Sequence, residues 1–191
     1  MPGPLKRHDE STAATASRSI RWDALAAVIA SLVGLLALLV AGYTAHIQRQ
    51  QVRAEVWPYL MWASSDTQSE YMWLNKGVGP AVVKSARVLV GGKVQPNWKA
   101  VMQSLGLGPM EYGQSTFNGS VLSPGETLEW LKFNDHDDFQ RFRDAAGQVG
   151  LAFEVCYCST LGDCWANDGK GASRAAVDNC PVVPEDEQFD D

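Results

Sequence analysis

Two groups of residues in this chain carry side chains that can do chemistry. The first is Asp135-His136-Asp137-Asp138, which places carboxylates on both sides of the only histidine beyond His46. Zinc sites draw several His or Cys ligands from separated positions, and a calcium loop needs alternating oxygen ligands and a central glycine, which this run lacks. A Ser-His-Asp arrangement stays open, although no Gly-x-Ser-x-Gly motif accompanies it. The pattern favours capping of a helix by the acidic residues over metal binding.

The second group is formed by the cysteines Cys156, Cys158, Cys164 and Cys180. Four thiolates can bind zinc, but the spacing lacks the paired Cys-x-x-Cys motifs typical of zinc sites, so we favour disulfides. Cys156 and Cys158 lie too far apart on one strand face to bridge, which excludes one of the three connectivities. We expect Cys158 to pair with Cys164 across a short turn, and Cys156 to pair with Cys180.

A β-rich region must position both groups, because from Val56 onward short runs of aromatic and β-branched residues alternate with Gly, Pro, Asn and Asp. We predict strands over residues 57–64, 70–75, 82–90, 93–95, 127–134, 149–159 and 164–166. Gly91-Gly92 predicts a two-residue hairpin between two of these strands. One helix is predicted over residues 97–105, which begin with the capping residue Asn97, and another over residues 137–147, which carry acidic residues in the first turn. No strand-helix-strand alternation supports a parallel sheet, so the fold class is mainly β, an antiparallel sandwich with one or two short helices.

One strand predicts which of its faces is buried. Leu151, Phe153, Val155 and Tyr157 alternate with Ala152, Glu154, Cys156 and Cys158. The first set is apolar and therefore faces the core, since successive side chains of a strand point to opposite sides. We expect the cysteines on the outer face, where a disulfide would hold a surface hairpin or tail.

The apolar run of residues 24–43 holds no charge and is long enough to cross the roughly 30 Å core of a bilayer as a helix. Trp22 and Tyr43 stand at its ends, where aromatic rings prefer the headgroup level. A cleaved signal peptide with Val40-Ala41-Gly42 as its processing site is one alternative, but its apolar part is usually shorter. A buried core helix is the other, but this run has no polar face. We predict a transmembrane helix that continues as a stalk over residues 22–55.

Basic residues near the ends of the helix predict its orientation, because they are retained in the cytoplasm. Four precede the helix and two follow it closely: Lys6, Arg7, Arg18 and Arg21, then Arg49 and Arg53. This imbalance favours a cytoplasmic N-terminus and a periplasmic C-terminal domain on the cell inner membrane. The cysteines then lie on the oxidising side, where disulfides persist.

The remaining composition sets the boundaries of the domain. Residues 1–21 hold few large apolar side chains and are predicted to form a disordered cytoplasmic tail. Residues 56–183 form the β-sandwich domain, and residues 184–191 are predicted to be a disordered acidic tail. From Ala54 onward acidic residues outnumber basic ones by nineteen to ten, which disfavours nucleic acid as a partner.

Small residues recur on one face of the membrane helix at spacings of three and four. They are Ala27, Ala30, Gly34, Ala37 and Ala41, called the small-residue seam below. Such a face lets helix backbones approach closely, so it is a candidate surface for homo-oligomerisation in the membrane. The alternative is that alanine is simply common in membrane helices.

Several motifs of the sequence together carry a family resemblance. They are the run Trp73-Leu74-Asn75-Lys76-Gly77-Val78-Gly79-Pro80-Ala81, Trp57-Pro58-Tyr59 upstream of it, Gly91-Gly92, and the ending Tyr157-Cys158-Ser159 through Cys164-Trp165 to Cys180. The sequence resembles uncharacterised bacterial single-pass inner-membrane proteins with an N-terminal anchor helix and an extracytoplasmic immunoglobulin-like β-domain. The resemblance implies that fold and that location. It implies no activity.

The sequence therefore predicts a membrane-anchored extracytoplasmic binding or accessory module of an envelope complex, with a protein partner that the sequence does not identify. We expect no enzymatic activity, no catalytic residue, and no metal or cofactor. The alternative function is a membrane-anchored periplasmic hydrolase that uses His136. A membrane sensor is disfavoured, because the N-terminal tail is too short for an output domain.

Overall fold

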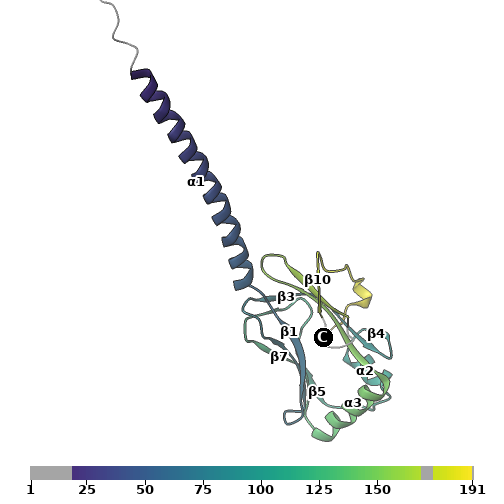
Figure 1. Ribbon diagram of the computed structural model, residues 1–191. Coiled ribbons are helices and arrows are strands. Elements are labelled where there is room, and N and C mark those ends of the chain that lie inside the picture. Colours follow the sequence, from purple (N-terminus) through teal and green to yellow (C-terminus); the bar gives the residue numbers. More distant parts are fainter. Residues whose placement is uncertain (1–18, 169–173, 191) are drawn as a thin grey trace, which may run out of the picture. The chain divides into compact units, whose positions relative to one another are not determined.

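The computed structural model describes residues 19–168 and 174–190. The chain divides into a helical unit up to Gln50 and a β-rich unit from Gln51 (Figure 1). Residues 1–18 of the predicted cytoplasmic tail lie outside the described residues, whereas 19–21 already belong to the first helix.

The first helix, α1, runs without interruption over Ser19–Glu55, including the predicted stalk. Thirty-seven residues at helical rise measure about 55 Å, more than a bilayer core requires. Among the described residues, α1 is the one helix that is long and apolar enough to span a membrane. An N-terminal signal sequence would meet the same criteria of length and composition. The helix ends just before Pro58, which cannot continue it.

Two antiparallel sheets make up the β-rich unit. One has the order β1 (Leu60–Ser65), β2 (Glu70–Asn75), β7 (Thr127–Phe133), β5 (Tyr112–Gln114). The other has the order β10 (Arg174–Val177), β9 (Cys164–Asp168), β8 (Leu151–Cys158), β3 (Ala81–Val90), β4 (Lys93–Gln95), and β6 (Val121–Leu122) also pairs with β3. Gly91 and Gly92 both adopt positive φ between β3 and β4, as the hairpin prediction requires.

An aromatic core fills the space between the sheets. Trp130 of β7 lies against Phe153 of β8, with ring centroids 5.1 Å apart, and Trp73 of β2 stacks on Phe117 at 4.7 Å. These rings are almost completely buried. Most of the aromatic side chains of the β-rich unit therefore serve the core, whereas Trp57 and Trp62 are each about 40% exposed.

Both predicted helices form, each with its predicted cap. Asn97 accepts a hydrogen bond from Ala100 N at the start of α2 (Trp98–Ser104). Asp135 accepts from the backbone N–H groups of Asp137 and Asp138 at the start of α3 (His136–Val149). The second helix is longer than predicted, so the prediction of strand at Val149 was wrong. The reason is that Gly150, at φ 92°, ends the helix, while Gly147 stays helical.

Three short strands, β5, β6 and β10, escaped prediction. They have two to four residues each, too few to show an alternating pattern. The predicted start of the first strand at residue 57 was also early, because the Trp57 carbonyl accepts from Val78 N and Gly79 N in a turn instead of pairing in the sheet.

The acidic C-terminal tail is not disordered over residues 184–190, which corrects the sequence prediction. A 3-10 helix, η1, spans Glu185–Glu187, and Phe189 behind it is 1% exposed. Phe189 N donates a hydrogen bond to Ala86 O of β3 at 3.0 Å. Ala86 lies between the residues of β3 that pair with β6 and those that pair with β4. One aromatic residue thus inserts the tail into the core, and the folded domain continues to residue 190.

Candidate functional site

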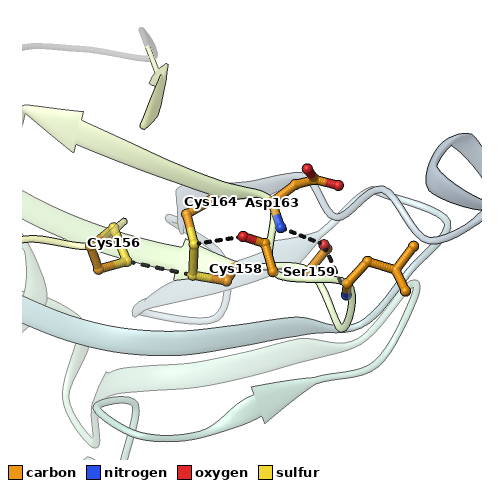
Figure 2. The surroundings of a disulfide bond; sticks show 8 residues. Cys156, Cys158, Ser159, Asp163 and Cys164 are labelled. Atoms are coloured by element: carbon orange, nitrogen blue, oxygen red, sulfur yellow. Dashed lines mark hydrogen bonds between the residues drawn. A yellow bond between two sulfur atoms is a disulfide. The ribbon is translucent and has the colours of Figure 1, made fainter. Parts of the chain in front are cut away.

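Strand β8 presents the cysteines to their partners (Figure 2). Cys158 lies directly opposite Cys164 of β9, and the two are bonded with a Cα–Cα distance of 4.0 Å. Cys156, two residues earlier on β8, is bonded to Cys180 with a Cα–Cα distance of 5.7 Å. Both bonds join the cysteines in the pairing favoured from the sequence, and all four cysteines of the chain are used.

The cysteine face of β8 is covered, contrary to the expectation of an open outer face. Cys156 is 3% exposed and Cys158 is 6% exposed, almost as little as the core residue Phe153 at 4%. The reason is that the segment with Cys180 crosses this face on its way to the buried Phe189. The apolar side chains of β8 do alternate along the strand, but over residues 155–158 both faces of the strand are buried.

The two disulfides touch each other. Cys158 Sγ lies 3.7 Å from Cys180 Sγ, so a sulfur of one disulfide lies close to a sulfur of the other. A dashed line joins the two sulfur pairs in Figure 2. Sulfur atoms of Cys158, Cys164 and Cys180 all lie within 4.8 Å of one another. Zinc binds thiolates, so this cluster has the ligand spacing for a metal only after both bonds are reduced.

A tight turn connects Cys158 to Cys164. Ser159 Oγ accepts from the backbone N–H groups of Leu161 and Asp163, both at 3.2 Å, and Ser159 N donates to Asp163 O at 2.7 Å. Gly162 takes positive φ, and Leu161 at the tip is 49% exposed. The disulfide Cys158–Cys164 therefore lies directly beneath a solvent-exposed loop.

His136 contacts a hydroxyl group that the sequence did not identify. Its Nδ1 atom lies 3.0 Å from Ser69 Oγ, and its Nε2 atom lies 3.1 Å from Gln140 Nε2. Ser69 sits in the β1–β2 turn with φ 53°, a rare backbone conformation for a residue with a side chain. The serine lies 67 positions from the histidine in the sequence, so only the fold reveals this pair.

The carboxylates beside His136 have other partners. Asp135 caps α3, as described above, and Asp138 forms an ion pair with Arg141. Capping was the interpretation favoured from the sequence. The described contacts do not join these carboxylates to either nitrogen of His136, so the arrangement is a Ser-His pair without the aspartate of a catalytic triad.

The motif that carries the family resemblance is held together by Asn75. This side chain is fully buried and makes four hydrogen bonds: its Oδ1 accepts from Tyr59 N and Gly77 N, and its Nδ2 donates to Gly79 O and Leu122 O. A Cβ at Gly77 would meet Trp57 O at 2.4 Å, so glycine is required for the close approach. The motif is therefore a structural turn between β2 and β3, and the sequence did not reveal the central role of Asn75.

Arg174 of β10 lies against Trp57-Pro58-Tyr59, the segment that leads into β1. Its guanidinium carbon is 4.5 Å from the Trp57 ring centroid and 4.1 Å from that of Tyr59. Its Nη1 also donates to Tyr157 Oη at 3.3 Å. These contacts attach the Trp57-Pro58-Tyr59 segment to the second sheet.

An apolar pocket of about 300 Å³ opens beside α2, and sequence reasoning did not find it. It is lined by Lys99, Met102, Gln103, Leu107, Gly108, Pro109, Met110 and Tyr112. Met102 is 5% exposed, and Leu107, Met110 and Tyr112 are partly buried against the core. Lys99 and Gln103 supply polar groups to an otherwise apolar lining. The only signal in the sequence was Met102 on the apolar face of the predicted helix.

The small-residue seam lies entirely within α1. Ala27, Ala30, Gly34, Ala37 and Ala41 are all exposed in the single chain. A Cβ added at Gly34 would meet no other atom within 4 Å. The seam is thus accessible to another helix.

Comparison of the chain with protein-family models, curated proteins and solved structures gives no significant match.

Proposed function

We propose that this protein is a single-pass inner-membrane protein whose β-rich unit is an extracytoplasmic binding module of an envelope complex. The observation that carries the binding role is the apolar pocket beside α2. A concave apolar site with a few polar groups is the usual form of a binding site. Methionine side chains such as Met102 and Met110 adapt to partners of different shape.

The location rests on the helix and the disulfides together. Helix α1 has exposed apolar residues along a stretch that is long enough to cross a bilayer. Four basic residues precede this stretch and two follow it, and this imbalance favours a cytoplasmic N-terminus. Two disulfides fit an oxidising compartment, here the periplasm. The small-residue seam is proposed to join copies of the helix in the membrane.

An immunoglobulin-like fold is part of the proposal. The order β1-β2-β7-β5 corresponds to strands A-B-E-D of that fold, and β9-β8-β3-β4 corresponds to G-F-C-C′. The added elements are α2, α3, β6, β10 and the C-terminal tail. Immunoglobulin-like domains commonly serve as recognition modules, so the strand order supports a binding role by analogy of fold.

The proposed ligand of the pocket is an apolar side chain of a partner protein, because about 300 Å³ accommodates one or two large side chains. A photo-reactive amino acid in place of Met110 is expected to cross-link that partner in intact cells. The same group in place of the exposed Lys84 of β3 is the matched control. Leu107→Glu should remove the adduct, and the circular dichroism spectrum of this variant checks that the domain still folds. Identical adducts from both positions, or adducts that persist in L107E, would contradict the pocket.

The orientation is tested separately with reporters fused after Asp191. A reporter enzyme active only outside the cytoplasm is expected to work at this position, and one active only in the cytoplasm is expected to fail. The reverse outcome would contradict the periplasmic location. It would leave the pocket as a binding site in another compartment.

A second candidate function, an anchored hydrolase, is favoured by one observation, the 3.0 Å contact between Ser69 Oγ and His136 Nδ1. A neutral imidazole at this distance can accept the proton of a serine nucleophile. Ser69 is only 8% exposed, however, and a nucleophile must reach its substrate. His136→Ala and Ser69→Ala variants that fold normally and retain the cellular phenotype would eliminate the hydrolase. Loss of the phenotype in both folded variants would favour the hydrolase over the binding function.

A further inference from the structure

The two disulfides form a unit that the binding function does not use. Cys158 is bonded to Cys164, yet its sulfur lies 3.7 Å from the sulfur of Cys180, close to van der Waals contact. We propose that this cluster is a thiol–disulfide exchange site. Its substrate is a dithiol, which is oxidised to a disulfide, and the protein is left with the bond Cys158–Cys180. The inference is independent of the proposed binding pocket, which lies on a different part of the domain.

The first step is attack by a thiolate of the dithiol on Cys164 Sγ. A mixed disulfide forms with Cys164, the Cys158–Cys164 bond breaks, and its electron pair leaves on Cys158 as a thiolate. Cys164 is 7% exposed and follows a turn whose residues 160–162 are exposed, so this step requires the turn to open and uncover its sulfur. The second thiol of the reagent then attacks its own sulfur in the mixed disulfide. The reagent leaves as a disulfide, and Cys164 becomes a thiol.

The second step takes place within the protein. The Cys158 thiolate attacks Cys180 Sγ, the bond Cys158–Cys180 forms, and the bond Cys156–Cys180 breaks with Cys156 leaving as a thiolate. One disulfide remains, two protein thiols are present, and one dithiol has been oxidised, so the electrons balance. The two thiols end on Cys156 and Cys164, which were not partners at the start.

Loop entropy does not oppose the exchange. The original bond Cys156–Cys180 spans 24 residues and the new bond Cys158–Cys180 spans 22. The entropy of closing a loop depends only logarithmically on its length, so the two bonds are almost equivalent in this respect. Cys158 Sγ already lies 3.7 Å from Cys180 Sγ, so the two sulfur atoms have to approach by less than about 2 Å to form the new bond.

The first experiment maps the bonds after partial reduction. The oxidised full-length protein in detergent is treated with limiting dithiothreitol, quenched with acid, alkylated and digested without further reduction. Among the molecules with two alkyl groups, about a tenth or more are expected to carry them on Cys156 and Cys164 and to release a peptide that links Cys158 to Cys180. Alkyl groups on Cys158 and Cys164 alone, with Cys156–Cys180 retained in all of these molecules, would overturn the proposal.

Two serine variants give the matched comparison. Cys164→Ser leaves Cys158 as the odd thiol beside Cys180, and the nearly equal loops predict Cys158–Cys180 and Cys156–Cys180 forms within about tenfold of each other. Cys158→Ser leaves Cys164 as the odd thiol, and Cys164 alone is expected to be alkylated. Alkylation confined to Cys158 in C164S would overturn the exchange. If C164S does not fold, the mapping of the wild-type protein decides alone.

Discussion

The ring of Phe189 lies edge-on against the indole of Trp98, with centroids 5.1 Å apart and planes inclined at 79°. The indole of Trp130, on β7, also contacts Phe189, and the centroids of these two rings are 5.5 Å apart. Phe189 thereby brings the C-terminal tail into the same core as α2 and β7. Arg87 extends this attachment at the surface through its ion pair with Glu187 at 2.7 Å.

Phe189→Ala is expected to lower the free energy of unfolding by about 3–5 kcal/mol, because it removes a fully buried aromatic ring and leaves a cavity. Urea unfolding followed by tryptophan fluorescence measures the change. Val182→Ala is the control, since Val182 is 97% exposed, and it should change stability by less than about 0.5 kcal/mol. A loss below about 1 kcal/mol in F189A would mean that the tail is not part of the core.

Asn75→Ala is expected to destabilise the domain by about 3 kcal/mol, because it leaves one buried and one partly buried backbone N–H group and two buried carbonyl groups without their partner. Thermal and urea unfolding give the magnitude. Asn134→Ala, at an exposed position, is the matched control and should be nearly neutral. Equal stability of the two variants would contradict the central role of Asn75 in the turn.

Tyr71 predicts a specific dependence of stability on alkaline pH. Burial raises the pKa of Tyr71 to about 12 from 10.0, Asp144 adds to the rise, and Arg143 opposes it. Because the unfolded chain loses this proton first, the contribution of Tyr71 is fully present below pH 10 and is lost as pH rises from about 10 to 12.

Tyr71→Phe should therefore lose less stability than the wild-type protein between pH 8 and pH 11, which urea unfolding at both values measures. Phenolate absorbance should show the late titration of Tyr71 in the wild-type protein, and this part of the titration should be missing in Y71F. The same alkaline loss in both proteins would show that the phenol of Tyr71 ionises without a folding penalty.

Gly34→Ile is expected to weaken self-association of the chain in vesicles by about fivefold or more, the effect of ~1 kcal/mol, because a branched side chain separates helices packed on the small-residue seam. Energy transfer between two labelled populations measures the association. Leu32→Ile is the control on the same helix, since it conserves volume away from the seam. Equal energy transfer in all three proteins would exclude the seam as a packing surface.

Features decided by neighbouring residues could be predicted from the sequence. The apolar run predicts α1, because backbone groups in a bilayer must be satisfied within one helix. Strands β2 and β4 begin and end at the predicted residues, and Asn97 caps α2 as predicted. The cysteine pairing was also accessible, because spacing along one strand excludes one connectivity and a short turn favours another.

Only the tertiary structure decided the features that depend on distant segments. The docking of Phe189 beside Trp98, the contact of Ser69 with His136 and the pairing of β5 with β7 join residues far apart in the sequence, and local patterns do not encode such distances. The pocket beside α2 likewise exists only once the loop after the helix folds back on it. For the acidic tail, composition indicated disorder, but burial of one aromatic ring in an existing slot outweighs the entropy of ordering a few polar residues.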